Sequence, residues 1–400
     1  MGGIENHLKM LAEGLVARGH EATVLVTNTD RATTRAQQNG VRVLKAGRMF
    51  ELASTPLSLS LVRTARAVKP DLVHLHMPYP PGDLAARAVA GAPPLVVTYH
   101  SDIVRQRRLL QLYRPLLHAT LRRANKIIVT STPYIQSSPF LRKHVGKCRV
   151  VPLSVDPARF AGVSPAAVTA LRQRLITHGA NAASASSSGL ILTVGVLRYY
   201  KGLDVLLDAL TQLDAQLVIV GSGPEEERLR ALAQAFGVAN RVLFAGRVGD
   251  AELPLYYAAA DVFVSASQVR AEAFGIVLLE AMAAGLPVVS TELGTGTSVV
   301  NQHGRTGFVV PPSDPHALAQ ALKVLLANED LRRQLGSAAQ QRVQAEYTDD
   351  LMLARTVAVY EEALRAGAQP LAQRSSAWLH RWRVSAPWIA RLGRQEHAKD

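Results

Sequence analysis

The stretch Ala271–Thr291, AEAFGIVLLEAMAAGLPVVST, combines two carboxylates, a glycine turn, a short apolar helix and a strand. Glu272 precedes a helix predicted over 276–284, and Glu280 is the only charged residue inside that helix. The Gly-Leu-Pro sequence that follows ends the helix, and Val288–Ser290 is predicted to be a buried strand. A carboxylate in so apolar a helix needs a partner. Two interpretations remain open: a ligand site, or an ordinary helix whose N-terminal dipole favours an acid.

Short apolar runs alternate with helical patterns along the chain, which is typical of mainly parallel α/β sheets. In the first half we expect strands at Ala22–Thr27, Val41–Leu44, Leu72–Leu75, Leu95–Tyr99, Lys126–Thr130 and Arg149–Pro152. In the second half we expect them at Leu190–Val194, Gln216–Val220, Val242–Ala245, Val262–Val264, Val288–Ser290 and Gly307–Val310. We predict two α/β domains, residues 1–156 and 157–365, facing a cleft, and a tail over 366–400.

The N-terminus begins with a glycine pair, Gly2 and Gly3, directly before a helical pattern over 4–17. In a doubly wound fold such a turn joins the first strand to the first helix, but here no strand precedes it. We therefore expect the first strand of this domain to be missing, through a start placed too late or a truncated form. Strand-like apolar codons upstream of Met1 would test this expectation.

The positive charge of the chain is concentrated in its first half. The net charge is +14, and residues 1–156 hold 22 Lys and Arg against 9 Asp and Glu, while the remainder holds 23 against 22. This asymmetry favours an anionic partner such as phospholipid, pyrophosphate or nucleic acid, although an arginine-rich composition without a specific partner explains it as well. A single cysteine, Cys148, excludes an intrachain disulfide and fits a reducing compartment.

Two basic segments suggest contact with a membrane, and each has an alternative. Residues 103–126 contain seven Lys and Arg among leucines, which suits a helix on an anionic bilayer or a solvated helix face. The tail carries all three tryptophans among arginines, so it could lie at a membrane interface or pack on the first domain. We expect no transmembrane helix and no signal peptide, and hence a cytoplasmic protein at the inner face of the plasma membrane.

Glycines at strand ends in the second half predict a phosphate site. Gly195 leads to Arg198 and Lys201, and Gly221 and Gly223 precede a helix. Glycine lets the backbone approach a ligand closely, free N–H groups at helix N-termini bind phosphate, and the two cations can neutralise a diphosphate. Because no acidic pair or His/Cys cluster has metal-ligand spacing, we predict neither a metal nor a cofactor.

Three further side chains complete a site for a nucleotide-sugar. Glu280 can accept hydrogen bonds from ribose hydroxyls, and Glu272 can accept them from a sugar. His100 follows the strand Leu95–Tyr99, at the edge where ligands bind in parallel sheets, although a histidine at a strand end is often only a polar loop residue.

Several motifs together resemble the retaining glycosyltransferases of family 4. EAFGIVLLEAMAAGLPVVS is similar to the E-x7-E signature of that family. The glycine loop at Gly2–Glu5, TYHSD around His100, VPLSVD before the second domain and VGSGPEEERL after Val220 are also similar to its segments. The resemblance implies the GT-B fold, in which two Rossmann-like domains face a cleft.

The resemblance also implies residue roles. Glu280 would hold the ribose of the sugar donor, and His100 would contact the sugar near the reacting carbon. Glu272, with the backbone of Ala273, Phe274, Gly275 and Ile276, would hold the sugar and diphosphate, and Gly3 would belong to the N-terminal glycine loop. Lys201 and a neighbouring arginine would bind the diphosphate. The usual phosphate arginine is replaced by Val196, which leaves Arg198 as the candidate.

The predicted function is transfer of a hexose, with retention, from a nucleotide diphosphate sugar to a glycan or a lipid-pyrophosphate-linked acceptor in polysaccharide or lipopolysaccharide assembly. GDP-mannose is the favoured sugar donor, with UDP-hexoses next. A nucleotide-sugar epimerase of the same fold is an alternative. A nucleic-acid-binding protein is disfavoured, because the cations do not alternate with an aromatic stacking platform.

Overall fold

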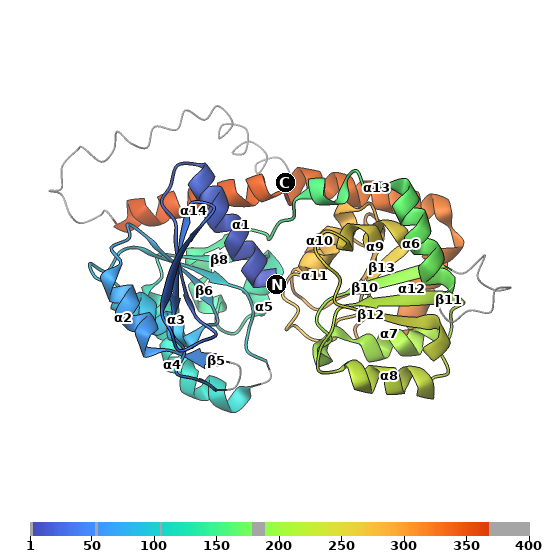
Figure 1. Cartoon of the computed structure of the whole chain (residues 1–400), viewed down its shortest axis with the longest axis horizontal. Coiled ribbons are helices and arrows are strands. Elements are labelled where there is room, and N and C mark those ends of the chain that lie inside the picture. The colour runs from blue at the N-terminus through green and yellow to red at the C-terminus, as the bar shows by residue number, and fades with distance from the viewer. Residues whose placement is uncertain (1–2, 53–54, 105, 178–188, 368–400) are drawn as a thin grey trace.

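The computed structural model describes residues 3–52, 55–104, 106–177 and 189–367, and they form two α/β domains side by side (Figure 1). The predicted tail lies outside the described residues from position 368 onward, and so does Gly2. Short 3-10 helices lie at Arg142–Lys147, Pro157–Phe160, Tyr199–Lys201 and Ala239–Arg241. None of the described helices is long and apolar enough to cross a bilayer.

The first domain contains two main sheets. The strands β6 (Val73–Met77), β7 (Leu95–Tyr99), β8 (Lys126–Val129) and β9 (Cys148–Val150) form a parallel sheet in that order. The strands β1 (Thr23–Thr27), β3 (Val41–Ala46) and β2 (Thr34–Gln38) form the other sheet, and β4 (Phe50–Leu52) and β5 (Thr55–Leu57) form a hairpin. The helices are α1 (Gly3–Ala17), α2 (Leu59–Ala67), α3 (Pro80–Ala88), α4 (Arg107–Arg123) and α5 (Thr132–Ser137). The predicted strands are confirmed, but β2, β4 and β5 were not predicted. β2 is polar and fully exposed, so it has no apolar alternation, and β4 and β5 have only three residues each.

A cavity of about 2470 Å³ opens between the two sheets of this domain. It is lined by apolar residues of α1, β1 and β6, including Leu11, Leu15 and Val24, and by His74, His76 and His100. Among the described residues β1 and β6 do not pair, and no strand precedes α1. In a doubly wound sheet the first strand lies at this place.

The second domain has one continuous parallel sheet in the order β12-β11-β10-β13-β14-β15, which is the doubly wound order. Its strands are β10 (Gly189–Val194), β11 (Ala215–Val220), β12 (Val242–Gly246), β13 (Val262–Ser265), β14 (Val288–Thr291) and β15 (Gly307–Val310). Its helices are α6 (Pro165–Thr177), α7 (Leu203–Leu210), α8 (Glu226–Ala235), α9 (Leu253–Ala259), α10 (Ile276–Ala283), α11 (Thr297–Val300), α12 (Pro315–Ala327) and α13 (Glu329–Glu346). Separate apolar clusters bury the two faces of the sheet, so α10 and its ends are held in a closed core.

The last described helix, α14 (Asp349–Gly367), returns to the first domain (Figure 1). Its residues Met352, Val359 and Ala363 are buried in a cluster with apolar side chains of β7 and β8. Glu362 pairs with Lys126 at 2.6 Å. Although the sequence division at residue 365 counts this segment with the second domain, its apolar face is buried on the first.

Candidate active site

Two glycine loops meet at the carboxyl edge of the second sheet. Gly195 follows β10 with φ 148° and Gly221 follows β11 with φ 127°, a region that side-chain-bearing residues rarely adopt. A Cβ atom on Gly221 would overlap with the carbonyl oxygen of Gly195, and one on Gly223 would overlap with that of Leu197. The backbones of the two loops therefore lie in direct contact, with no side chain between them.

Lys201 and Glu272 form an ion pair beside these loops. The Lys201 Nζ atom lies 2.5 Å from Oε2 of Glu272, and the two side chains are only 16% and 12% exposed. Burial, the largest single influence, disfavours the charged ammonium, but Glu272 and Tyr200 together raise the pKa of Lys201 above its ordinary value. A Cβ on Gly195 would lie 3.5 Å from Nζ, so the cation sits directly over the glycine loop. The structure thus brings three of the predicted site residues together.

The loop that carries Glu272 ends at the N-terminus of α10. Gly275 caps that helix with φ 82°, so the turn favours glycine. Thr295 Oγ1 donates to the Glu272 carbonyl at 2.9 Å, and the Gly296 amide donates to the Ala273 carbonyl at 2.8 Å. The predicted backbone segment from Ala273 to Ile276 is therefore fixed in place. The free N–H groups of the first helical turn form a positive end suited to a phosphate.

Glu280 lies inside α10, as predicted, and is partly buried. The Tyr257 hydroxyl of α9 donates to Oε2 of Glu280 at 2.8 Å. Burial raises the pKa of Glu280, while the Tyr257 hydrogen bond opposes that shift. Among the described residues the Glu280 side chain has no other hydrogen bond, so its second oxygen can accept from a ligand hydroxyl. Sequence analysis did not identify Tyr257.

His100 lies at the end of β7 in the first domain, where it was predicted, and is 7% exposed. His76 Nδ1 lies 2.9 Å from His100 Nε2, and the two rings stack with centroids 5.2 Å apart. Burial, followed by the nearby His7, lowers the pKa of His100 to about 3, so its imidazole is neutral near pH 7. His76 was not among the predicted site residues, although it contacts His100. The neighbouring His74 bonds to Thr98 and Tyr360, so its ring is held by first-domain and α14 groups.

The remaining predicted residues lie around the space between the domains. Arg198 is exposed and lines the same cavity as His100, and its guanidinium makes no hydrogen bond or ion pair within the described part of the chain. Gly3 is the first residue of α1, whose N-terminus lies between the domains in Figure 1. No hydrogen bond or ion pair joins His100 to Glu272, Lys201 or Glu280 in the described structure. No group of three or more His, Cys, Asp or Glu residues is arranged to hold a metal among the described residues.

Comparison with known families matches both halves of the chain. The family described as glycosyl transferases group 1 matches residues 180–342, and Glycosyltransferase Family 4 matches residues 1–159. The chain belongs to the family 4 glycosyltransferases. The expected family and enzyme class are therefore confirmed.

Individual relatives cover most of the glycosyltransferase chain. It is 38% identical to D-rhamnosyltransferase WbpZ of Pseudomonas aeruginosa, over 87% of this chain and 89% of that protein. It is 35% identical to O-antigen chain mannosyltransferase C of Escherichia coli (91% and 95% covered), and 31% identical to a GDP-mannose-dependent alpha-(1-6)-phosphatidylinositol monomannoside mannosyltransferase of Mycobacterium tuberculosis (88% and 93%). Sucrose-phosphate synthase from Thermosynechococcus elongatus superposes with a TM-score of 0.75 at 24% identity, covering 91% of this chain and 94% of that one. The predicted two-domain GT-B fold is confirmed.

Proposed function

We propose that this glycosyltransferase moves mannose, with retention, from GDP-mannose to a glycan or lipid-linked acceptor in the assembly of a surface polysaccharide. The observation that carries the proposal is the Lys201–Glu272 pair over the glycine loops, because it places a cation for a diphosphate beside a carboxylate for sugar hydroxyls. Relatives named for mannosyl transfer, for O-antigen and for GDP-mannose support the sugar, the pathway class and the nucleotide.

The ion pair between Lys201 and Glu272 suggests how the sugar donor is recognised. A diphosphate that approaches the N-terminus of α10 attracts the Lys201 ammonium, which frees a Glu272 oxygen to accept from the sugar. Arg198 can reach the same phosphates from the rim. Glu280, with one oxygen held by Tyr257, accepts from the ribose with the other.

These groups stabilise the leaving group. When the bond between sugar C1 and the phosphate oxygen breaks, negative charge grows on the nucleoside diphosphate, and backbone amides and Lys201 neutralise it. We propose on this basis that transfer requires neither a metal nor a cofactor. The acceptor oxygen bonds to C1 from the face that the phosphate leaves, and its proton passes to the departing phosphate oxygen. In this scheme Glu272 accepts from a sugar hydroxyl and does not attack C1.

In this scheme the first domain contributes the His100 imidazole, which contacts the donor sugar. Its imidazole is neutral, so it can donate to or accept from a sugar hydroxyl without placing a positive charge beside an electron-poor C1. Because His100 belongs to the opposite domain, we propose that it acts on the sugar after the nucleotide has bound.

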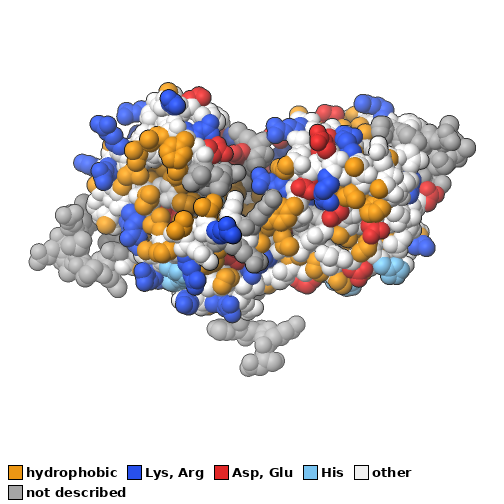
Figure 2. Space-filling model, turned by 90° about the horizontal axis from the view of Figure 1, so that it is seen from below, with side chains coloured by type: hydrophobic (Ala, Val, Ile, Leu, Met, Phe, Trp, Pro, Cys, Tyr) orange, Lys and Arg blue, Asp and Glu red, His pale blue; other side chains and the backbone are white. Residues whose placement is uncertain are grey.

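The basic face of α4 is the proposed membrane contact. Leu109 and Leu112 are 40% and 80% exposed, and Arg108, Arg114 and Arg122 are exposed beside them on the helix. Figure 2 shows Lys and Arg side chains gathered over the first domain, while acids and bases mix over the second. An anionic inner leaflet would attract this face and bring a lipid-linked acceptor to the cleft. We therefore propose a cytoplasmic enzyme peripherally bound to the inner membrane face, with no nucleic-acid partner.

A panel of sugar donors tests the proposed function. Purified protein is incubated with GDP-mannose, GDP-D-rhamnose or UDP-glucose, with and without a mannosylated acceptor, and release of nucleoside diphosphate is measured. D-rhamnose is 6-deoxy-mannose, so the first two donors isolate the contribution of the C6 hydroxyl. We expect acceptor-dependent turnover that is highest with GDP-mannose. UDP release or epimerisation without acceptor would favour the epimerase instead.

Two variants test the site assignment in the same assay. Glu272→Ala and His100→Ala should each lower turnover of the preferred donor by about a hundredfold. Glu329→Ala, at a 68% exposed position on α13, is the matched control and should leave turnover unchanged. Turnover at the wild-type level in both site variants would refute the assignment.

A further inference from the structure

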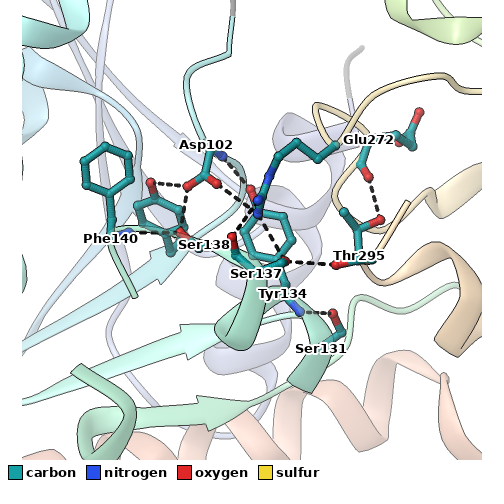
Figure 3. A network of polar contacts seen from close by, with 11 residues as sticks. Asp102, Ser131, Tyr134, Ser137, Ser138, Phe140, Glu272 and Thr295 are labelled. Carbon is teal, nitrogen blue, oxygen red and sulfur yellow. Dashed lines mark hydrogen bonds and ion pairs between the residues drawn. The ribbon is translucent and has the colours of Figure 1, made fainter. Parts of the chain in front are cut away.

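Arg270 connects the two domains beside the proposed site. It lies in the loop between β13 and α10, two residues before Glu272. Its Nη2 atom is 3.0 Å from Oδ2 of Asp102, and its Nη1 atom donates to the Ser137 carbonyl at 2.6 Å (Figure 3). Both partners belong to the first domain, so one guanidinium holds two of its segments.

Groups of the first domain hold Asp102 in place independently of Arg270. It lies two residues after His100, and its side chain is 6% exposed. The hydroxyls of Tyr99 and Ser138 both donate to Oδ1 at 2.8 Å, and the Asp102 amide donates to the Tyr134 hydroxyl at 2.5 Å. Because Oδ1 is already occupied by first-domain donors, Oδ2 faces Arg270. The Asp102 carboxylate therefore keeps a fixed position relative to the end of the strand that precedes His100.

First-domain residues that surround Arg270 also contact the loop that carries Glu272 and the neighbouring loop after β14. Ser137 Oγ donates to the Gly294 carbonyl at 2.9 Å, next to Thr295, which holds the Glu272 carbonyl. Ala273 packs in the apolar cluster of the first domain. The Arg270 guanidinium also lies 5.3 Å from the centre of the Tyr134 ring, at a cation–π distance. Figure 3 shows these contacts as one network that passes from Asp102 to Thr295.

A buried charge pair of this kind determines geometry more than it adds stability. The Coulomb attraction is offset by desolvation of Asp102, but leaving either charge alone is unfavourable, so the pair excludes other arrangements. Arginine is suited to the position because its planar guanidinium serves Asp102, Ser137 and Tyr134 at once, which a lysine ammonium cannot do.

We propose that Arg270 is an interdomain positioning residue: through its ion pair with Asp102 it sets the separation of the Glu272 loop from the His100 strand end, so that both can hold one sugar. The inference rests on the proposed function for the roles of Glu272 and His100. The groups proposed to bind the nucleotide all belong to the second domain. Arg270 therefore governs the chemical step rather than the affinity for nucleoside diphosphate.

Kinetics of Arg270→Gln, Arg270→Lys and Asp102→Asn provide the first arm of the test. We expect kcat to fall at least about tenfold in Arg270→Gln and Asp102→Asn, with KM for the sugar donor and Kd for GDP within about twofold of wild type. Arg270→Lys should retain intermediate activity. The double variant Arg270→Gln/Asp102→Asn should be no worse than the poorer single variant, because both substitutions remove one interaction. The control is Arg333→Gln, which removes an exposed ion pair of α13 with Glu329 and should change nothing.

The interdomain distance provides a second arm that does not depend on activity. Spin labels are attached to Arg66→Cys on α2 and Glu227→Cys on α8, both at exposed positions, and the distance distribution is measured by pulsed electron resonance. We expect a distribution in Arg270→Gln that is broader than in the wild-type background. If the wild-type protein shows no turnover but the distance distribution still broadens in Arg270→Gln, the proposed function is refuted and the positioning role of Arg270 stands. Wild-type kcat in Arg270→Gln, a parallel rise in Kd for GDP, or an unchanged distribution would overturn the inference.

Discussion

The two domains repeat the same β-α-β unit but differ in how their sheets are filled. The second domain has six strands in one sheet with a closed core on each face. The first has two separate sheets with a cavity between them, lined partly by histidines. The comparison teaches that the two sides of the site depend on different parts of the chain. The proposed nucleotide side is built from backbone conformations that favour glycine, and the opposite side from buried imidazoles at the edge of the cavity.

The largest expected effect comes from adding a side chain where the glycine loops touch. Gly221→Val should destabilise the second domain by about 3 kcal/mol and abolish GDP binding, because the new side chain overlaps with the Gly195 carbonyl at an unfavourable φ. Denaturant unfolding and calorimetry measure both effects. Gly249→Val is the control, since a Cβ atom added at Gly249 would meet no other atom within 4 Å. Equal behaviour of the two variants would contradict a backbone-built nucleotide side.

Removing the cation beside those loops should have the next largest effect. Lys201→Gln is expected to lower kcat/KM about a hundredfold, because the leaving diphosphate loses its buried countercharge and Glu272 loses its partner. Steady-state kinetics measure this loss. Lys323→Gln on α12 serves as the control. A loss below threefold would show that Lys201 does not face the diphosphate.

The first domain should be the acid-sensitive one. Burial lowers the pKa of His7 to about 4 and that of His100 to about 3, below the ordinary 6.5. As pH falls below 6.5 the unfolded chain binds protons that the folded chain does not, so the free energy of unfolding decreases. We expect a loss of about 1.5 kcal/mol for each of these histidines between pH 6.5 and 5. Hydrogen exchange, corrected for its intrinsic pH dependence, should show β6–β8 losing protection before β10–β15, and the reverse order would contradict the comparison.

The smallest effect concerns the hydrogen bond that orients Glu280. Tyr257→Phe should weaken GDP binding by about fivefold, or about 1 kcal/mol, the net contribution of a typical hydrogen bond. Tyr256→Phe, on the same helix, is the matched control because the described structure gives it no hydrogen bond to Glu280. Calorimetric titration with GDP compares the two variants. Equal affinities would mean that Tyr257 only fills space.

Much of the fold could be predicted from the sequence because each buried strand is a short apolar run bounded by turn residues. The helix and strand of the stretch Ala271–Thr291 were predicted nearly residue for residue, since Gly275 and Gly285 mark both ends of the helix. By contrast, the packing of α14 on the first domain could not be predicted, because an amphipathic pattern does not indicate which apolar surface a helix covers.

The site was predictable where a motif lies within one segment, and not where contacts join distant segments. Lys201 and Glu272 were named from their own local patterns, and the structure brings them together. Arg270 and Asp102 are 168 positions apart and lie in different domains, so no spacing rule relates them. Tyr257 was not predicted either, because a tyrosine in an apolar helix is ordinarily a core residue.

The most direct test of the central claim is calorimetric titration of GDP into wild-type protein, Glu280→Gln and His100→Ala. If the second domain alone binds the nucleotide, Glu280→Gln weakens GDP binding by about tenfold and His100→Ala leaves it unchanged. The account would be contradicted if His100→Ala weakened GDP binding as much as Glu280→Gln, or if neither substitution changed it.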